Sequence, residues 1–410
     1  MPSGEYTHNH YVPEWYQKRF MPNGEVKFHY LDLSPPVRIN NGHCYRLKEV
    51  RRLGPPSCFA EANLYTTNWL GTANNDIEKH FFGEIDTRAR AAVKFFTNYE
   101  IKDGLHDAFR DLVRYMSVQK LRTPKGLSYL EKIFPARDRN QLLLHLQRYE
   151  NLHCAIWTDA VWQIADASES PTKFILNDHP VTIYNRACFP ASKYCRNFMD
   201  PDIRHVGSHT LFPLSYNKIL ILTNLAWVRD PYQNELRFGP NEKLFHTTIF
   251  NGTDIQQGRK LSELEVRQIN YVLKKRAYRY VASPVKDWLY PETHLPSTHW
   301  SRFGGGFLFM PEPRGIHMGG ETFVGYKDGR SEAWNEYGQR PWEKDYQNQK
   351  RFNRESATLT RFQDEFAARF GASWRGWPYD YGKNGPQADS DEHYQRRLER
   401  AARHRRKASK

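Results

Sequence analysis

A helical series of apolar residues is continued by two polar residues, which are the first candidates for chemistry. The series begins at Leu105 and runs through Leu112 and Met116, and its next positions are Gln119 and Arg122. Such steps of three or four predict one buried helix face. A buried Gln or Arg is costly unless its polar groups are bonded. We therefore expect a carboxylate from another segment to meet them.

The preceding helical segment supplies two carboxylates, Glu84 and Asp86. In a structural interpretation, Arg122 forms a salt bridge with Glu84 or Asp86 that fixes two helices together. In a functional interpretation, Arg122 holds an anionic oxygen of a substrate and Gln119 orients a carboxylate or a water molecule. Both interpretations place Gln119 and Arg122 inside the fold.

Asp178 is the third candidate, because it follows a short apolar run, Phe174-Ile175-Leu176, and precedes His179 and Pro180. A carboxylate at the end of a strand is a common active-site position, but Asp also forms turns with its own backbone. Adjacent side chains on an extended backbone point in opposite directions. We therefore expect at most one of Asp178 and His179 to face a shared site, and we assign Asp178 to it.

His10 near the N-terminus completes the candidate centre as a general base or a metal ligand. One histidine with the carboxylates of Glu84, Asp86 and Asp178 suits Mg²⁺ or Mn²⁺, and such ions support phosphodiester cleavage. The alternative is that His10 and the adjacent Tyr11 only anchor an N-terminal strand.

These candidates must be positioned by helices and strands that come from distant parts of the chain. Apolar periodicity predicts a helix over residues 77–96, a second from 105 to the Thr123-Pro124 pair, and a third over 139–165. Ser262 and Glu265 form a capping-box pattern at the start of a helix over 262–281. A strand is expected at 26–31, and it forms an N-terminal hairpin or strand pair with 10–20. Further strands are expected at 174–176, 181–184, 210–214 and 218–223. The stretch 33–57 is expected to be a loop. The fold class is α+β, with a helical block packed on a small, mostly antiparallel sheet of N-terminal and central strands.

Three regions follow from the change in composition along the chain. Residues 8–282 form the α+β domain, 283–380 an irregular extension rich in Gly, Pro and aromatics with one helix near 355–370, and 381–410 a basic tail expected to be disordered. In the extension, Trp374-Arg375-Gly376-Trp377-Pro378-Tyr379 either stacks nucleic-acid bases or packs the segment onto the domain.

Composition excludes several classes of protein and favours an anionic partner. The 410 residues carry a formal net charge of +14, of which the last twenty contribute eight Lys or Arg against three Asp or Glu. This balance favours nucleic acid or another polyanion. Five scattered cysteines without a C-x-x-C pair argue against a disulfide framework or structural zinc. Without a secretory signal or a membrane-length apolar run, we expect a soluble cytoplasmic protein.

Ordered landmarks in the sequence resemble the domain-of-unknown-function 4238 family, which is uncharacterised and mostly bacterial. The resemblance covers roughly residues 8–282 and rests on His10-Tyr11-Val12-Pro13 with Tyr16 and Phe20, on Gln119-x-x-Arg122-Thr123-Pro124, on Leu176-Asn177-Asp178-His179-Pro180-Val181, on Phe212-Pro213-Leu214-Ser215, and on 270–280. Glu78, Glu84 and Asp86 stand where that family has acidic residues. The resemblance implies a fold and candidate residues but no established activity.

Three functions are compatible with these observations. The leading hypothesis is a metal-dependent hydrolase of nucleic-acid or nucleotide phosphodiesters, with His10, Asp178, Gln119 and Arg122 as catalytic residues and Glu84, Asp86 and Asp178 as Mg²⁺ or Mn²⁺ ligands. The alternative is a non-enzymatic protein that binds nucleic acid or a partner and whose polar cluster is structural. A third is a sensor that binds a small molecule. Convergence of Asp178, Arg122, Gln119 and His10 in an open cleft favours the enzyme, whereas dispersed or sealed residues favour a binding protein.

Overall fold

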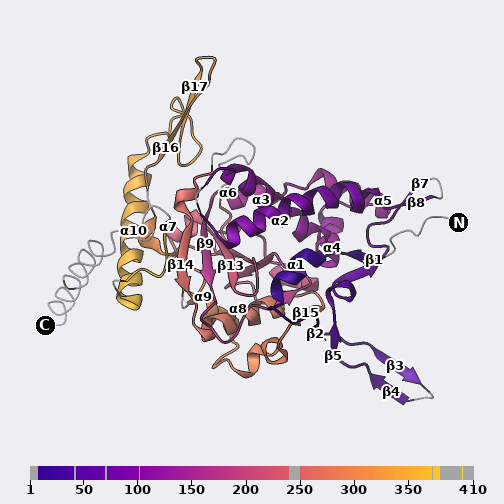
Figure 1. Ribbon diagram of the computed structural model, residues 1–410. Coiled ribbons are helices and arrows are strands. Elements are labelled where there is room, and N and C mark those ends of the chain that lie inside the picture. The colour runs from indigo at the N-terminus through magenta and orange to yellow at the C-terminus, as the bar shows by residue number, and fades with distance from the viewer. Residues whose placement is uncertain are drawn as a thin grey trace.

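Strands from distant parts of the sequence form two mostly antiparallel sheets in this computed structural model (Figure 1). The structure describes residues 8–40, 43–69, 72–100, 102–239, 250–305, 307–316, 318–371, 373–378 and 399. The larger sheet has the order β11 (Thr182–Asn185), β12 (Ser208–Pro213), β13 (Lys218–Asn224), β9 (Ala160–Asp166), β14 (Gln256–Lys260) and β18 (Trp377–Pro378). Its strands pair antiparallel except for β14 and β9, which are parallel. Every residue of β12 is buried, because this strand is covered on both faces.

The second sheet joins the N-terminal part of the chain to its centre. It has the order β10 (Leu176–Asn177), β15 (Tyr280–Ser283), β2 (Phe28–Asp32) and β5 (Val50–Leu53). Four separate strand pairs complete the β structure: β1 (His8–His10) with β6 (Ala60–Ala62), β3 (Val37–Asn40) with β4 (His43–Arg46), β7 (Thr67–Trp69) with β8 (Thr72–Asn74), and β16 (Glu321–Gly325) with β17 (Ser331–Asn335). The expected α+β class and its mostly antiparallel sheets are therefore confirmed.

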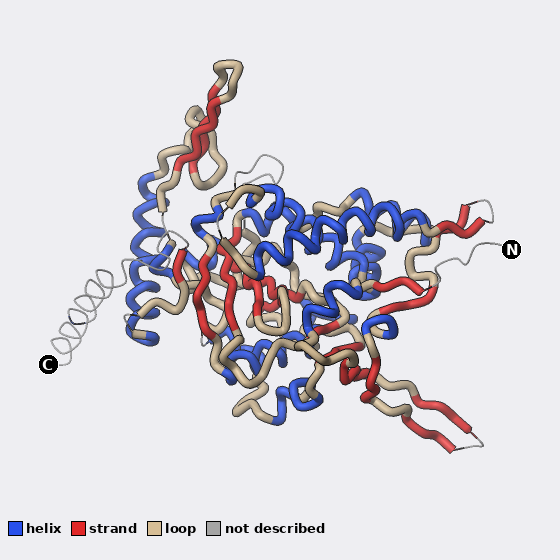
Figure 2. The backbone as a smooth tube through the Cα atoms, viewed as in Figure 1, coloured by secondary structure: helices blue, strands red, loops and turns tan. Residues whose placement is uncertain are grey.

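Helices cover these sheets and come mainly from the block between residues 77 and 158 (Figure 2). They are α1 (Glu14–Gln17), a π-helical turn (Ile77–Phe82) that runs into α2 (Gly83–Thr97), α3 (Leu105–Arg122), α4 (Pro124–Ile133), α5 (Arg139–Arg148), α6 (Cys154–Thr158), α7 (Leu225–Arg229), α8 (Glu263–Arg276), α9 (Trp300–Gly305) and α10 (Gln349–Phe370). Short 3₁₀ turns lie at Lys18–Phe20, Pro55–Ser57, Lys193–Phe198, Gly252–Asp254, Lys286–Leu289, Pro291–Thr293 and Pro313–Gly315. No helix in the described ranges is long and apolar enough to cross a membrane.

Two predicted helices extend too far, because their last residues form strands instead. The third helix, predicted over 139–165, is divided into the short helices α5 and α6. Its last residues form strand β9, in which Val161, Trp162 and Ile164 are buried. Pairing within a buried sheet overrides the weak helical period here. The helix predicted over 262–281 ends at Arg276, and β15 follows it. Its capping box, Ser262 with Glu265, is present as predicted.

The N-terminal third also differs from prediction. Residues 10–20 do not pair with β2; instead β1 pairs with β6, and α1 follows. The stretch 33–57, expected to be a loop, contains β3, β4 and β5, and the β3–β4 pair projects from the body at the lower right of Figure 1. These strands are only four residues long, contain Arg and are preceded by Pro35 and Pro36, so the alternation of apolar and polar residues is too short to distinguish them from a loop.

The C-terminal extension packs on the domain through several segments, and Trp300, Phe303 and Phe309 belong to the main hydrophobic core. Phe362 and Phe366 of α10 pack with Val206 and Trp227, and β18 adds an edge strand to the large sheet beside β14. The β16–β17 pair projects away from the body (Figure 1). The basic tail 381–410 lies outside the described residues except for Glu399, so the expected disorder there stays a prediction.

Candidate functional site

The C-terminal half of α3 is buried on every side, and this burial determines the site. Ser117, Gln119, Lys120 and Arg122 are all less than 9% exposed, as are the apolar residues between them. Each polar group must therefore find a partner inside the protein. They do so in two separate clusters on opposite faces of the helix.

Arg122 is held by Asp86 and Gln119 in the first cluster. Its two terminal nitrogens donate to the carboxylate of Asp86 at 2.9 and 3.2 Å, and its Nε donates to Gln119 Oε1 at 2.7 Å. Gln119 Nε2 in turn donates to the carbonyl of Tyr11 at 2.8 Å. Although burial works against the charged guanidinium, Asp86 raises the pKa of Arg122 above its usual value. All three donor groups of Arg122 are engaged, so the structural interpretation, a salt bridge to Asp86, is confirmed.

Glu84 and His10 do not join this cluster. Glu84 is more than half exposed and lies 3.3 Å from Arg88 on its own helix. His10 lies 3.2 Å from the carbonyl of Pro56, and its strand β1 pairs with β6. Burial lowers the pKa of His10. Its contacts are those of the alternative reading, in which it anchors the N-terminal strand.

Asp178 is fully occupied by backbone. Its two oxygens accept hydrogen bonds from the N–H groups of Tyr278, Arg279 and Tyr280 at 2.6–2.7 Å, and the residue is 1% exposed. Burial raises the pKa of Asp178 to about 6, while the three N–H groups favour its charged form. The carboxylate thus fixes the link between α8 and β15. We assigned Asp178 to a shared site with His10, Arg122 and Gln119, and the structure does not place it there, because its side chain turns toward this backbone.

The predicted metal centre is not assembled. Glu84, Asp86 and Asp178 each have different partners, and within the described ranges no three His, Cys, Asp or Glu side chains form a group that could hold a metal ion. Gln119 and Arg122 are buried and bonded to each other, whereas His10 and Asp178 have partners elsewhere. This arrangement favours a binding protein over the predicted enzyme.

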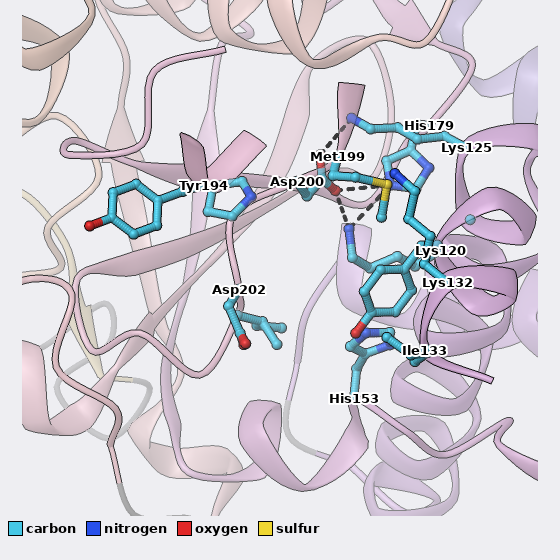
Figure 3. A pocket seen from close by; sticks show the side chains of 14 residues that line it. Lys120, Lys125, Lys132, Ile133, His153, His179, Tyr194, Met199, Asp200 and Asp202 are labelled. Atoms are coloured by element: carbon cyan, nitrogen blue, oxygen red, sulfur yellow. Dashed lines mark hydrogen bonds and ion pairs between the residues drawn. The ribbon is translucent and has the colours of Figure 1, made fainter. Parts of the chain in front are cut away.

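The second cluster lies on the opposite face of α3 and contains two lysines, a histidine and one carboxylate (Figure 3). Lys120 Nζ donates to Asp200 Oδ2 and to the carbonyl of Val181 at 3.3 Å, and it lies 3.1 Å from His179 Nε2. Lys125 Nζ donates to Asp200 Oδ1 at 2.6 Å and to the carbonyl of Arg276 at 2.7 Å. The Asp200 carboxylate therefore lies between two buried ammonium groups.

The close approach of α4 to the end of α3 brings the two lysines together. A Cβ at Gly126 would lie 2.0 Å from the carbonyl oxygen of Lys120, so only glycine fits there. Thr123 caps α4 by accepting from the N–H of Gly126 at 3.1 Å, and its hydroxyl lies 2.7 Å from His179 Nδ1. The Thr123-Pro124 pair thus ends one helix, starts the next, and places Lys125 in its first turn.

Charge in this cluster is set by burial and by the lysines. Burial lowers the pKa of Lys120, and Asp200 opposes that change. Burial also works against the charged form of Asp200, but Lys120 and Lys125 hold the pKa of this carboxyl well below its usual range. Burial and the neighbouring Lys120 lower the pKa of both His153 and His179 to about 3. At neutral pH the cluster therefore contains two neutral imidazoles and a carboxylate that offsets one ammonium group.

A cavity of about 270 Å³ opens beside Asp200. His153 faces it, 3% exposed, with Nδ1 3.4 Å from the hydroxyl of Ser117. Lys132 of α4 is exposed at the mouth. Apolar and aromatic side chains form the remaining wall: Tyr129, Ile133, Tyr194, Met199, Pro201 and Ile203. Asp202, which also lines the cavity, is paired with Arg204 at 2.6 Å.

Sequence reasoning missed the residues of this cavity, although two signals were present. Alternation along an extended backbone correctly separates Asp178 from His179, but His179 rather than Asp178 faces the cavity. His153 stands in an apolar helical series, where a polar residue needs a partner. Lys120 and Lys125 gave no signal, because an isolated lysine on a predicted helix is usually exposed.

In the part of the segment 374–379 that the structure describes, Arg375 and Trp377 pack onto the domain. Arg375 donates to Glu265 at 2.7 Å, and the ring of Trp377 lies against Gly258. Residues 321–371 contain nine Lys or Arg and nine Asp or Glu. Packing therefore explains this segment as far as Trp377, and Tyr379 lies outside the described residues.

Comparison with known proteins adds no assignment. No family model matches the sequence, no curated protein is significantly similar to it, and no solved structure matches the fold. The resemblance to the domain-of-unknown-function 4238 family stays a prediction.

Proposed function

We propose that this protein binds a small phosphomonoester in the cavity beside Asp200, and that it acts as a binding protein or sensor. One observation carries the proposal: two buried lysines share a single carboxylate at a partly enclosed cavity. Lys120 and Lys125 with Asp200 leave one positive charge, and Lys132 at the mouth adds another. A phosphomonoester carries a charge of about −2 near neutral pH, which matches this excess.

The donors beside the cavity suit phosphate oxygens. A lysine ammonium group has three N–H donors, and Lys125 uses two of them, on Asp200 and on the carbonyl of Arg276. The third remains for a ligand oxygen. His153, neutral because burial lowers its pKa to about 3, offers Nε2 as a further polar contact. The volume of about 270 Å³ is just below the usual range for ligand pockets, so the ligand is no larger than a sugar or nucleoside phosphate.

Binding is favoured over hydrolysis by the state of the histidines. A general base works best when its pKa lies near the working pH, whereas the pKa values of His153 and His179 are lowered to about 3. The metal-dependent phosphodiesterase hypothesis needs Glu84, Asp86 and Asp178 in one site, and each has its own partner elsewhere. The protein is therefore proposed to bind a phosphate group through its lysines and not to hydrolyse a phosphodiester at a metal centre.

Isothermal titration calorimetry with ribose 5-phosphate tests the proposal, with ribose as the uncharged control. Ribose 5-phosphate should bind and ribose should not. Lys132→Ala should weaken binding about fivefold, because one exposed ion contact is worth about 1 kcal/mol. Lys94→Ala, an exposed lysine on α2 outside the cavity lining, should leave binding unchanged. Equal binding of ribose, no binding of either compound, or an unaltered Lys132→Ala variant would refute the proposal.

A further inference from the structure

Two buried cysteines lie close together in the segment between β11 and β12. Cys188 and Cys195 are 0% and 1% exposed, and they are separated by seven positions. Cys195 Sγ lies 3.7 Å from the carbonyl oxygen of Cys188, and the two thiol groups are close enough to shift each other's pKa. Turns ending at each cysteine, with backbone bonds to Asn185 and Ser192, hold this arrangement.

A guanidinium group faces both cysteines. Arg276, the last residue of α8, donates from Nη1 to Cys195 Sγ at 3.0 Å and from Nη2 to the carbonyl of Cys188. Its guanidinium also lies 4.7 Å from the ring centre of Trp300. A buried cation that donates to sulfur favours the thiolate over the thiol.

The two thiols consequently differ in protonation. The hydrogen bond from Cys188 and the charge of Arg276 lower the pKa of Cys195 to about 6 against the effect of burial, while the same thiol pair and burial raise that of Cys188. The Arg276 contact therefore favours the thiolate at Cys195 and leaves Cys188 as the thiol. Two other buried cysteines behave in the opposite way: burial raises the pKa of Cys58 to about 12 and raises that of Cys154 as well.

We propose that Cys188 and Cys195 form an oxidation site, at which hydrogen peroxide converts the thiol pair into an intramolecular disulfide. The Cys195 thiolate attacks one peroxide oxygen; an S–O bond forms, the O–O bond breaks, and hydroxide leaves and takes up a proton. The Cys188 sulfur then attacks the Cys195 sulfur of the resulting sulfenic acid. An S–S bond forms, the S–O bond breaks, and water leaves with the Cys188 proton. One peroxide is reduced for each disulfide.

The segment between the two cysteines carries exposed side chains. Phe189 is 51% exposed and Tyr194 38%, and Lys193 between them is also exposed. The segment that joins the two cysteines therefore lies at the surface of the protein. Cys58 and Cys154 have no such basic partner on sulfur; Cys154 instead donates to the carbonyl of Val113 at 3.5 Å.

Peptide mapping after oxidation tests the proposal on the full chain. The reduced protein is treated with a slight excess of hydrogen peroxide, free thiols are blocked with N-ethylmaleimide, and the protein is digested with trypsin. Cleavage after Arg186, Lys193 and Arg196 places the two cysteines on different peptides, 187–193 and 194–196. The expected product is a cross-link of these two peptides, with Cys58 and Cys154 recovered as blocked thiols.

Variants separate the two steps. In Cys188→Ser, Cys195 should accumulate as a sulfenic acid that reacts with dimedone, and in Cys195→Ser neither product should form. The wild-type experiment needs no variant, so a folding defect leaves the test intact. Cross-linking through exposed Cys44 alone, or equal labelling of Cys58, Cys154 and Cys195, would overturn the proposal.

Discussion

The ammonium group of Lys125 donates a hydrogen bond to the backbone carbonyl of Arg276 at 2.7 Å. This contact joins the first turn of α4 to the last residue of α8, and thereby joins the ligand cavity to the thiol pair. The Arg276 side chain faces Cys195, and its carbonyl faces Lys125. The charge of Cys195 should therefore change the electrostatic potential in the cavity.

Oxidation of the thiol pair should strengthen binding of a phosphomonoester. A disulfide removes the thiolate that offsets Arg276, so the surroundings of the cavity become more positive. At an effective dielectric constant near 20, two unit charges roughly 15 Å apart interact by about 1 kcal/mol. We expect the affinity for ribose 5-phosphate to rise about two- to fivefold after oxidation. Calorimetry on oxidised and reduced protein measures this, and Cys195→Ser, in which neither oxidation product forms, is the control. Weaker binding after oxidation would contradict the coupling.

Asp200→Asn should destabilise the protein by about 3–5 kcal/mol, because it removes the charge shared by two buried lysines. Urea unfolding at pH 7 measures the change. The matched control is Asp202→Asn, whose side chain is 32% exposed and paired with exposed Arg204. It should lose about 1 kcal/mol or less. Similar losses for the two variants would show that the cluster is not a buried ion network.

Stability should fall as the pH drops below 6.5, owing to buried neutral histidines. Burial lowers the pKa of His209 to about 3. The unfolded chain takes up a proton as the pH falls below about 6.5 while the folded protein does not, so each such histidine costs about 1.4 kcal/mol of stability per pH unit. His209→Gln should flatten the decline by that amount between pH 6 and pH 5. Urea midpoints at several pH values test this, and parallel curves for variant and wild type would refute it.

Asp86 and Glu84 lie two residues apart on α2 but should differ in importance. Asp86→Ala leaves the buried guanidinium of Arg122 without its partner and should cost about 3–5 kcal/mol. Glu84→Ala removes weak, solvent-exposed pairs with Arg88 and Arg114 and should cost less than about 1 kcal/mol. Neither change should alter ligand binding, because neither residue lines the cavity. Thermal unfolding combined with calorimetry separates stability from binding here.

Much of the local structure was predictable from particular residues. The apolar series ending at Gln119 and Arg122 corresponds to α3, Leu105–Arg122. The requirement for a buried partner led to Glu84 or Asp86, and Asp86 is the partner. The capping box at Ser262 marks the start of α8. These features are local, or follow from the cost of burying one polar group.

The candidate site could not be predicted in the same way. The direction of Asp178 depends on three N–H groups about one hundred residues later in the chain, and no local pattern reports them. The burial of Lys120 and Lys125 depends on the contact of α4 with the end of α3 and on Asp200 arriving between them. Long-range packing, rather than residue type, turns these common surface residues into a site.

Comparison of the phosphorylated and unphosphorylated forms of one sugar tests the central claim most directly. Calorimetric titration of the reduced wild-type protein with ribose 5-phosphate and with ribose, repeated on Lys132→Ala and Lys94→Ala, isolates the phosphate and the cavity. We predict binding of ribose 5-phosphate alone, about fivefold weaker in Lys132→Ala and unchanged in Lys94→Ala. Identical behaviour of the two sugars, or of the two lysine variants, would contradict the account.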